Sequence, residues 1–89
     1  MTRIVRVQTG LRLEKRLLKV MKGLAEHLEI SVAELVEAMA LHAFEGKQAF
    51  SDDTMAKIAQ LKAVYDLDIG AADSHCLSDG AEKETGDDG

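Results

Sequence analysis

The sequence predicts a mainly helical protein that begins with one short strand. Three observations favour this fold class. The chain of 89 residues has no proline or tryptophan, and its 46% of hydrophobic residues are mostly Leu, Ala, Val, Ile and Met, as in small helical domains. Apolar residues recur at helical spacing over most of its length. Only residues 3–9 alternate as a strand does, with arginine and β-branched side chains in turn.

The strand predicted over residues 3–9 has no candidate partner elsewhere in the chain. Unpaired backbone N–H and C=O groups are unfavourable, so we expect this strand to pair with its copy in a second chain across a two-fold axis. Strand side chains alternate between two faces, which places Val5 and Val7 toward the helices and Arg6 and Gln8 outward. A structured portion of roughly 60 residues buries little apolar surface alone, and this also favours a homodimer.

The first helix is predicted over residues 11–28, where apolar residues recur every three or four positions. Gly23 lies inside this segment. A glycine there costs up to about 1 kcal/mol relative to alanine, or it marks a close contact with another helix.

Capping signals mark the next two helices. Ser31 and Glu34 form a Ser-x-x-Glu capping box, and Gly46 is placed to end the helix that follows. Ser51 is the predicted N-cap of a third helix, which we expect to fade near Asp68.

Three regions are therefore expected: a core over residues 1–46, an accessory helix within 47–69, and an acidic tail over 70–89. The tail has six acids, one lysine and few apolar residues, so we expect it to be disordered. No apolar run approaches the roughly 20 residues that a membrane span needs. The single cysteine, Cys76, suits a reducing compartment, so the protein is expected to be cytoplasmic.

Charge is distributed unevenly along the chain. The net charge is −5, but residues 1–22 carry +6 and residues 23–89 carry −11. A basic amino-terminal segment on an acidic body is typical of a protein that binds a polyanion. The alternative is a solvated helix face without a ligand. The basic residues of this segment are Arg3, Arg6, Arg12, Lys15, Arg16, Lys19 and Lys22.

Residues 3–46 resemble the ribbon-helix-helix family of DNA-binding dimers. The most telling stretch is LEISVAELVEA, in which Ser31, Glu34, Leu35 and Val36 stand where the family has a serine cap, a glutamate and two apolar residues. The family usually has glycine two residues before that serine, and this chain has Glu29.

The resemblance implies that the paired strands lie in the major groove of double-stranded DNA and that their outward side chains read base edges. Arginine can bind guanine and glutamine can bind adenine through two hydrogen bonds each. The strand occupies residues 3–9, or residues 7–13 if the family spacing is counted back from the serine without gaps. The base-contacting candidates are Arg6 and Gln8, with Ile4 or Arg12 according to register; the phosphate-contacting candidates are Thr2, Arg3, Lys15, Arg16, Ser31 and Val32.

Three functions remain open at this point. The first is a homodimeric transcriptional regulator, such as a repressor. The second is an antitoxin of the same fold that binds a toxin through residues 47–89. The third is a small helical adaptor that binds no DNA. The histidines are scattered and no base or nucleophile converges on a carboxylate pair, so neither catalysis, a metal nor a cofactor is expected.

Overall fold

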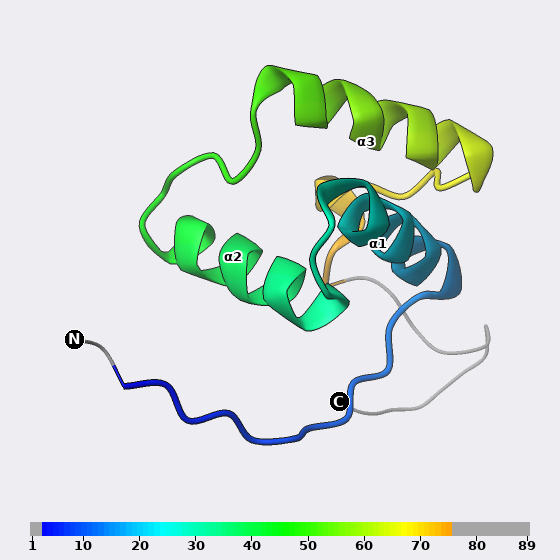
Figure 1. The fold of residues 1–89 in the computed structure, drawn as a ribbon. Coiled ribbons are helices and arrows are strands. Elements are labelled where there is room, and N and C mark those ends of the chain that lie inside the picture. Colours follow the sequence, from blue (N-terminus) through cyan, green and yellow to red (C-terminus); the bar gives the residue numbers. More distant parts are fainter. Residues whose placement is uncertain (1–2, 76–89) are drawn as a thin grey trace.

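A computed structural model of the chain describes residues 3–75 and confirms that the protein is mainly helical (Figure 1). Helix α1 spans Lys15–Leu28, α2 spans Val32–Phe44 and α3 spans Asp52–Val64. A short 3-10 turn, η1, follows at Ala71–Asp73. Within the described residues, every helix is too short or too polar to cross a membrane.

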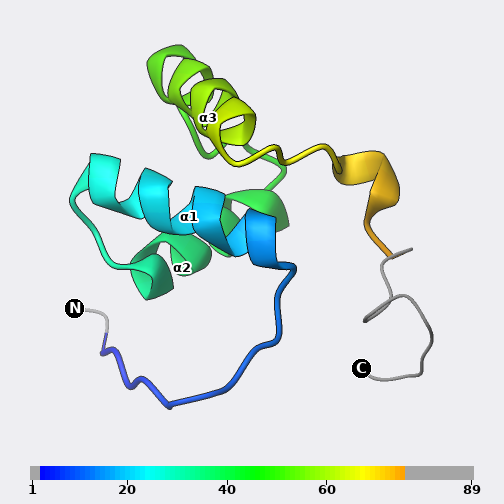
Figure 2. The same ribbon diagram turned by 90° about the vertical axis from the view of Figure 1, so that its right-hand side faces the viewer.

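Helix α1 is the centre of the fold. Helices α2 and α3 both pack against α1 but do not pack against each other, and Figure 2 shows α1 between them. The core lies mainly between α1 and α2, where the apolar stripe of α1 meets Leu35. Phe50 and Ile58 extend this core toward α3. Its buried members are Met21, Leu24, Ala25 and Leu35.

Gly23 marks a close contact between helices, as its position in the sequence suggested. A Cβ atom at Gly23 would lie 3.0 Å from Cδ2 of Leu61 on α3. Ordinary carbon contacts are about 3.5–4.0 Å, so glycine lets α3 approach α1 closely.

The turn between α1 and α2 has a left-handed residue at Glu29, with φ 61° and ψ 41°. The Ile30 N–H donates to the Ala25 carbonyl at 3.0 Å, and the Glu29 N–H donates to the Glu26 carbonyl at 3.1 Å. These two bonds form a Schellman motif, which usually has glycine at the left-handed position. Glu29 therefore adopts a conformation that favours glycine.

The other two helices end in the same way. At the end of α2, Gly46 has φ 67° and the Lys47 N–H donates to the His42 carbonyl at 2.8 Å. At the end of α3, Asp66 has φ 55° and the Leu67 N–H donates to the Lys62 carbonyl at 2.9 Å. The prediction that Gly46 ends the second helix is confirmed.

Both predicted serine caps are confirmed. The Glu34 N–H donates to Ser31 Oγ at 3.0 Å, and the Ser31 N–H donates to the Glu34 carboxylate at 2.9 Å, which completes the capping box. Ser51 Oγ accepts from the Thr54 N–H at 3.2 Å and caps α3.

Two predicted helix boundaries are wrong. Helix α1 begins at Lys15 rather than at residue 11, because the Glu14 side chain accepts from the Leu17 N–H at 2.8 Å and acts as N-cap. Helix α3 ends at Val64 rather than near Asp68, because its C-terminal turn closes there.

The two ends of the described chain also differ from expectation. Residues 3–14 form neither strand nor helix in the single chain, so the predicted strand at 3–9 or 7–13 has no ladder partner here. Residues 70–75 are not a disordered tail, because the Gly70 N–H donates to the Asp73 carboxylate at 2.8 Å and η1 forms. The rest of the predicted tail, residues 76–89, lies outside the described residues, as does Cys76.

Candidate functional site

The amino-terminal arm, residues 3–13, is exposed along its whole length. Figure 1 shows it as an extended trace that leaves the start of α1 and passes along the side of the molecule where α2 begins. Within residues 3–75, the backbone of residues 3–11 makes no hydrogen bond to other backbone groups. Its large apolar side chains are also uncovered, and Val7 is 83% exposed. Residues 3–11 thus present both unpaired backbone groups and β-branched side chains to solvent.

Arg6, the first base-contacting candidate, binds Glu37 on α2. Its Nε and one terminal nitrogen each lie 3.0 Å from a different carboxylate oxygen of Glu37. This hydrogen bonding holds the pKa of Glu37 below its ordinary value and raises that of Arg6. The Arg6 and Glu37 side chains remain 61% and 45% exposed, so the pair is solvated and dissolved salt screens its attraction.

Arg16, a phosphate-contacting candidate, is held by acceptors on the segment before α1 and on the segment after α3. Its guanidinium donates to the Glu14 carboxylate at 3.1 Å, to the Asp66 carbonyl at 2.9 Å and to the Asp68 carboxylate at 2.8 Å. The pKa of Glu14 is lowered first by the hydrogen bond from the Leu17 N–H and then by Arg16. Arg16 therefore ties the segment after α3 to the start of α1.

The remaining phosphate-contacting candidates lie at the ends of α1 and α2. Lys15 is the first residue of α1 and is exposed. Ser31 caps α2, and Val32 begins it. The Ser31 N–H is occupied by the Glu34 carboxylate, which also places a negative charge at this helix end.

The structure brings the base-contacting candidates and the start of α2 to one side of the molecule. The Arg6–Glu37 pair holds the arm beside the amino-terminal half of α2. Lys15 and Arg16 lie instead at the opposite end of α1 from Ser31. Arg3, Ile4, Gln8 and Arg12 are exposed on the arm, and Thr2 lies outside the described residues.

Helix α2 exposes much apolar surface. Ten of its thirteen residues are apolar, yet only Leu35 is buried, at 1% exposure. Leu41 is largely exposed and Phe44 is 84% exposed. A helix that is apolar on all sides is ordinarily buried on several of them. The single chain therefore leaves part of α2 without the cover that its composition requires.

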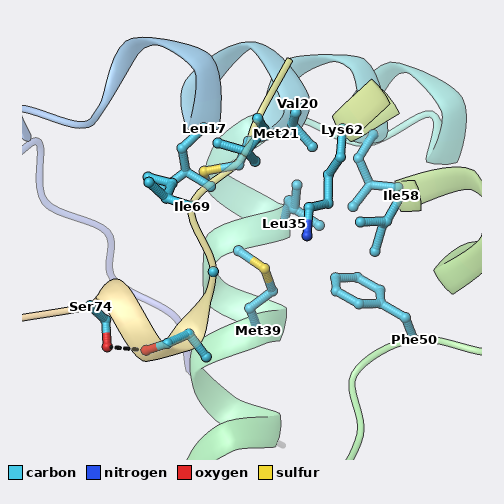
Figure 3. A pocket seen from close by; sticks show the side chains of 14 residues that line it. Leu17, Val20, Met21, Leu35, Met39, Phe50, Ile58, Lys62, Ile69 and Ser74 are labelled. Carbon is cyan, nitrogen blue, oxygen red and sulfur yellow. Dashed lines mark hydrogen bonds between the residues drawn. The ribbon is translucent and has the colours of Figure 1, made fainter. Parts of the chain in front are cut away.

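An apolar cavity of about 340 Å³ lies between the three helices and residues 67–74 (Figure 3). It forms because α2 and α3 pack on α1 but not on each other. Met21 and Leu35 belong both to the core and to the cavity wall. Lys62 of α3 is the only residue with a charged side chain among those that line it.

Three features of these sites have no direct signal in the sequence. Glu37 meets Arg6 across 31 residues, Asp68 meets Arg16 across 52 residues, and Lys62 faces a cavity. Alternation and helical periodicity indicate which residues share a face of an element, but they do not show which distant segment lies beside that face.

Within residues 3–75, no three histidine, cysteine, aspartate or glutamate side chains come close enough together to hold a metal ion. Comparison of the chain with protein-family models, with curated proteins and with solved structures finds no match. Function is therefore inferred from the arm, the apolar surface of α2 and the cavity.

Proposed function

We propose that the protein is a homodimeric, sequence-specific DNA-binding regulator of the ribbon-helix-helix type. The amino-terminal arms of two chains pair as an antiparallel ribbon, and this ribbon enters the major groove of double-stranded DNA. The observation that carries the proposal is the arm itself. Residues 3–11 are exposed, have no backbone partner in the described part of the chain, and alternate between apolar residues and Arg6 or Gln8.

Three further features support a ribbon-helix-helix dimer. A second arm supplies the missing backbone partners and covers Val5 and Val7. A second copy of α2 covers the apolar surface that includes Leu41 and Phe44. The left-handed turn at Glu29 lies at the position where the resembled family usually has glycine, the residue that prefers this conformation.

The charge distribution supports DNA as the ligand. Seven basic residues and one acid lie in residues 1–22, and the arm carries three of the seven, Arg3, Arg6 and Arg12, so two paired arms place six arginines near one two-fold axis. Arg6 and Gln8 read bases, with Ile4 or Arg12 added by register. Thr2, Arg3, Lys15, Arg16 and the backbone N–H groups just after Ser31, beginning with Val32, contact phosphate. The solvated Arg6–Glu37 pair is weak enough for DNA to replace Glu37 as the partner of Arg6.

The test begins with selection of a preferred site from randomised duplex DNA, followed by fluorescence anisotropy on that site. Arg6→Ala and Gln8→Ala are expected to weaken specific binding about tenfold or more and to relax preference at one base position. Lys15→Ala is expected to weaken specific and non-specific binding alike and to reduce the salt dependence. Lys57→Ala on α3 is the control and should leave both unchanged.

A second variant pair tests the role of the intrachain ion pair. Glu37→Gln removes the competitor for Arg6 and should tighten DNA binding. Glu45→Gln removes the same charge just after the end of α2, where a Glu45 carboxylate oxygen lies 3.4 Å from Lys47 Nζ. This variant should change DNA affinity less than Glu37→Gln does. Equal effects of the two variants would refute the competition between Glu37 and DNA for Arg6. No DNA binding by the parent at low salt would refute the proposed function and favour the adaptor function.

The antitoxin function stays a separate prediction. It requires a toxin that binds residues 47–89, and a toxin gene beside this one would support it. Deletion of residues 76–89 separates the two functions, because it should weaken toxin capture while leaving the DNA-binding arm in place.

A further inference from the structure

The cavity between α1, α2 and α3 has the size and lining of a small-ligand site. Its volume of about 340 Å³ lies at the lower end of the roughly 300–1,000 Å³ that is usual for such sites. An apolar cavity of about 150 Å³ already accommodates benzene. The cavity can therefore hold a hydrocarbon body about twice that size.

The wall of the cavity is almost entirely apolar. Helix α1 contributes Leu17, Val20, Met21 and Leu24, and the loop before α3 contributes Phe50. The segment after α3 closes one side with Leu67, Ile69, Gly70, Ala71 and Ser74. Ser74 Oγ donates to the Ala71 carbonyl at 2.9 Å, so its hydroxyl proton is already used (Figure 3).

Lys62 is the exception in this wall. Figure 3 shows its side chain extending from α3 among the side chains that line the cavity. The Lys62 ammonium nitrogen forms no hydrogen bond or ion pair within residues 3–75. Lys62 as a whole is partly buried, and an ammonium group beside apolar walls gains a charge-assisted hydrogen bond when an anion pairs with it.

We propose that this cavity binds a small amphipathic carboxylate, with the hydrocarbon body among the core side chains and the carboxylate on the Lys62 ammonium. The medium-chain fatty acids are the ligand class that fits both the volume and the single cation. This inference does not depend on DNA binding.

The acidic end of the chain is a poor alternative occupant. Residues 76–89 contain five acids but only one large apolar residue, Leu77. One leucine side chain cannot fill an apolar cavity of about 340 Å³.

The experiment compares octanoate with octanol, which have the same chain length but differ in charge. Octanoate at tenfold excess over its Kd should raise the Tm of the full chain by about 5–10 °C, and octanol should bind more weakly. In ¹³C methyl spectra, octanoate should shift the methyl signals of Leu35, Met39, Ile58 and Ile69, which face the cavity. The signals of Leu41, exposed on α2, should not move.

Lys62→Met keeps the apolar stem of the side chain and removes the charge. It should weaken octanoate binding about tenfold or more and leave octanol binding unchanged. Lys57→Met, on the same helix but outside the cavity wall, is the matched control and should bind octanoate like the parent.

Three outcomes would overturn the proposal. The first is equal affinity for octanoate and octanol in the parent. The second is octanoate binding that Lys62→Met does not weaken. The third is a set of methyl shifts centred on Leu41, which would indicate adsorption to the exposed surface of α2. Failure of this experiment leaves DNA binding, measured by anisotropy, unaffected.

Discussion

The contact between Gly23 and Leu61 allows a worked prediction about how α3 packs on α1. Alanine in place of glycine inside a helix stabilises it by about 0.8–1.0 kcal/mol. At Gly23 the new Cβ would lie 3.0 Å from Leu61 Cδ2, at least half an ångström inside ordinary contact distance. Moving the Leu61 side chain off its rotamer costs about 0.5–1.5 kcal/mol. The two effects nearly cancel, so Gly23→Ala should change the free energy of unfolding by less than about 0.7 kcal/mol.

The assay is urea unfolding followed by circular dichroism at one fixed protein concentration. Position 22 is the reference, because Lys22 is exposed and the difference between Lys22→Ala and Lys22→Gly reports helix propensity alone. In the Leu61→Ala background, Gly23→Ala should regain the full stabilisation of about 0.8–1.0 kcal/mol. If Gly23→Ala stabilises the parent as much as it stabilises the Leu61→Ala variant, α3 does not lie against α1 at this point.

Three more predictions concern assembly, the interhelical turn and acid stability. Since arm pairing is part of folding in the proposed dimer, the Tm should rise with protein concentration, and Val5→Pro should abolish this rise; a concentration-independent Tm would count against the ribbon. Glu29→Gly should raise the free energy of unfolding by about 0.5–1 kcal/mol, because glycine adopts φ 61° without steric cost, and a loss of stability in urea would contradict the strained turn. The pKa of Glu14 is lower in the folded state than its ordinary value. The stability that its carboxylate contributes is therefore complete above the ordinary pKa and is lost as the pH falls through the pKa of the folded state. The Tm difference between the parent and Glu14→Gln should therefore shrink on acidification, and a constant difference would show that the carboxylate charge has no role.

Local signals in the sequence were reliable guides to the helices. Ser31, Glu34, Ser51 and Gly46 act on backbone groups three or four residues away, so their effect can be read from spacing alone. The start of α1 was missed because Glu14 acts as N-cap without the usual serine, threonine, aspartate or asparagine. The ends of α1 and α3 at Glu29 and Asp66 likewise lack the glycine that would have marked them.

The candidate site was only partly accessible to sequence reasoning. The alternation over residues 3–9 predicted that Val5 and Val7 face the helices, but in the single chain both are exposed, as are Arg6 and Gln8. Of the two readings of Gly23, the close helix contact is the one the structure shows. The strand pairing, the bases read and the phosphates bound stay predictions, because they depend on a second chain and on DNA.

The sequence by itself determined the helical class, the two serine caps and the concentration of positive charge near the amino terminus. These follow from composition and from interactions between residues that are close in the chain. Only the tertiary structure decided that Arg6 meets Glu37, that Arg16 meets Asp68, and that a cavity opens beside Lys62. The physical reason is that these contacts join segments 31 to 52 residues apart or depend on the gap left where α2 and α3 fail to touch. Such positions result from the packing of all three helices together and have no local pattern that specifies them.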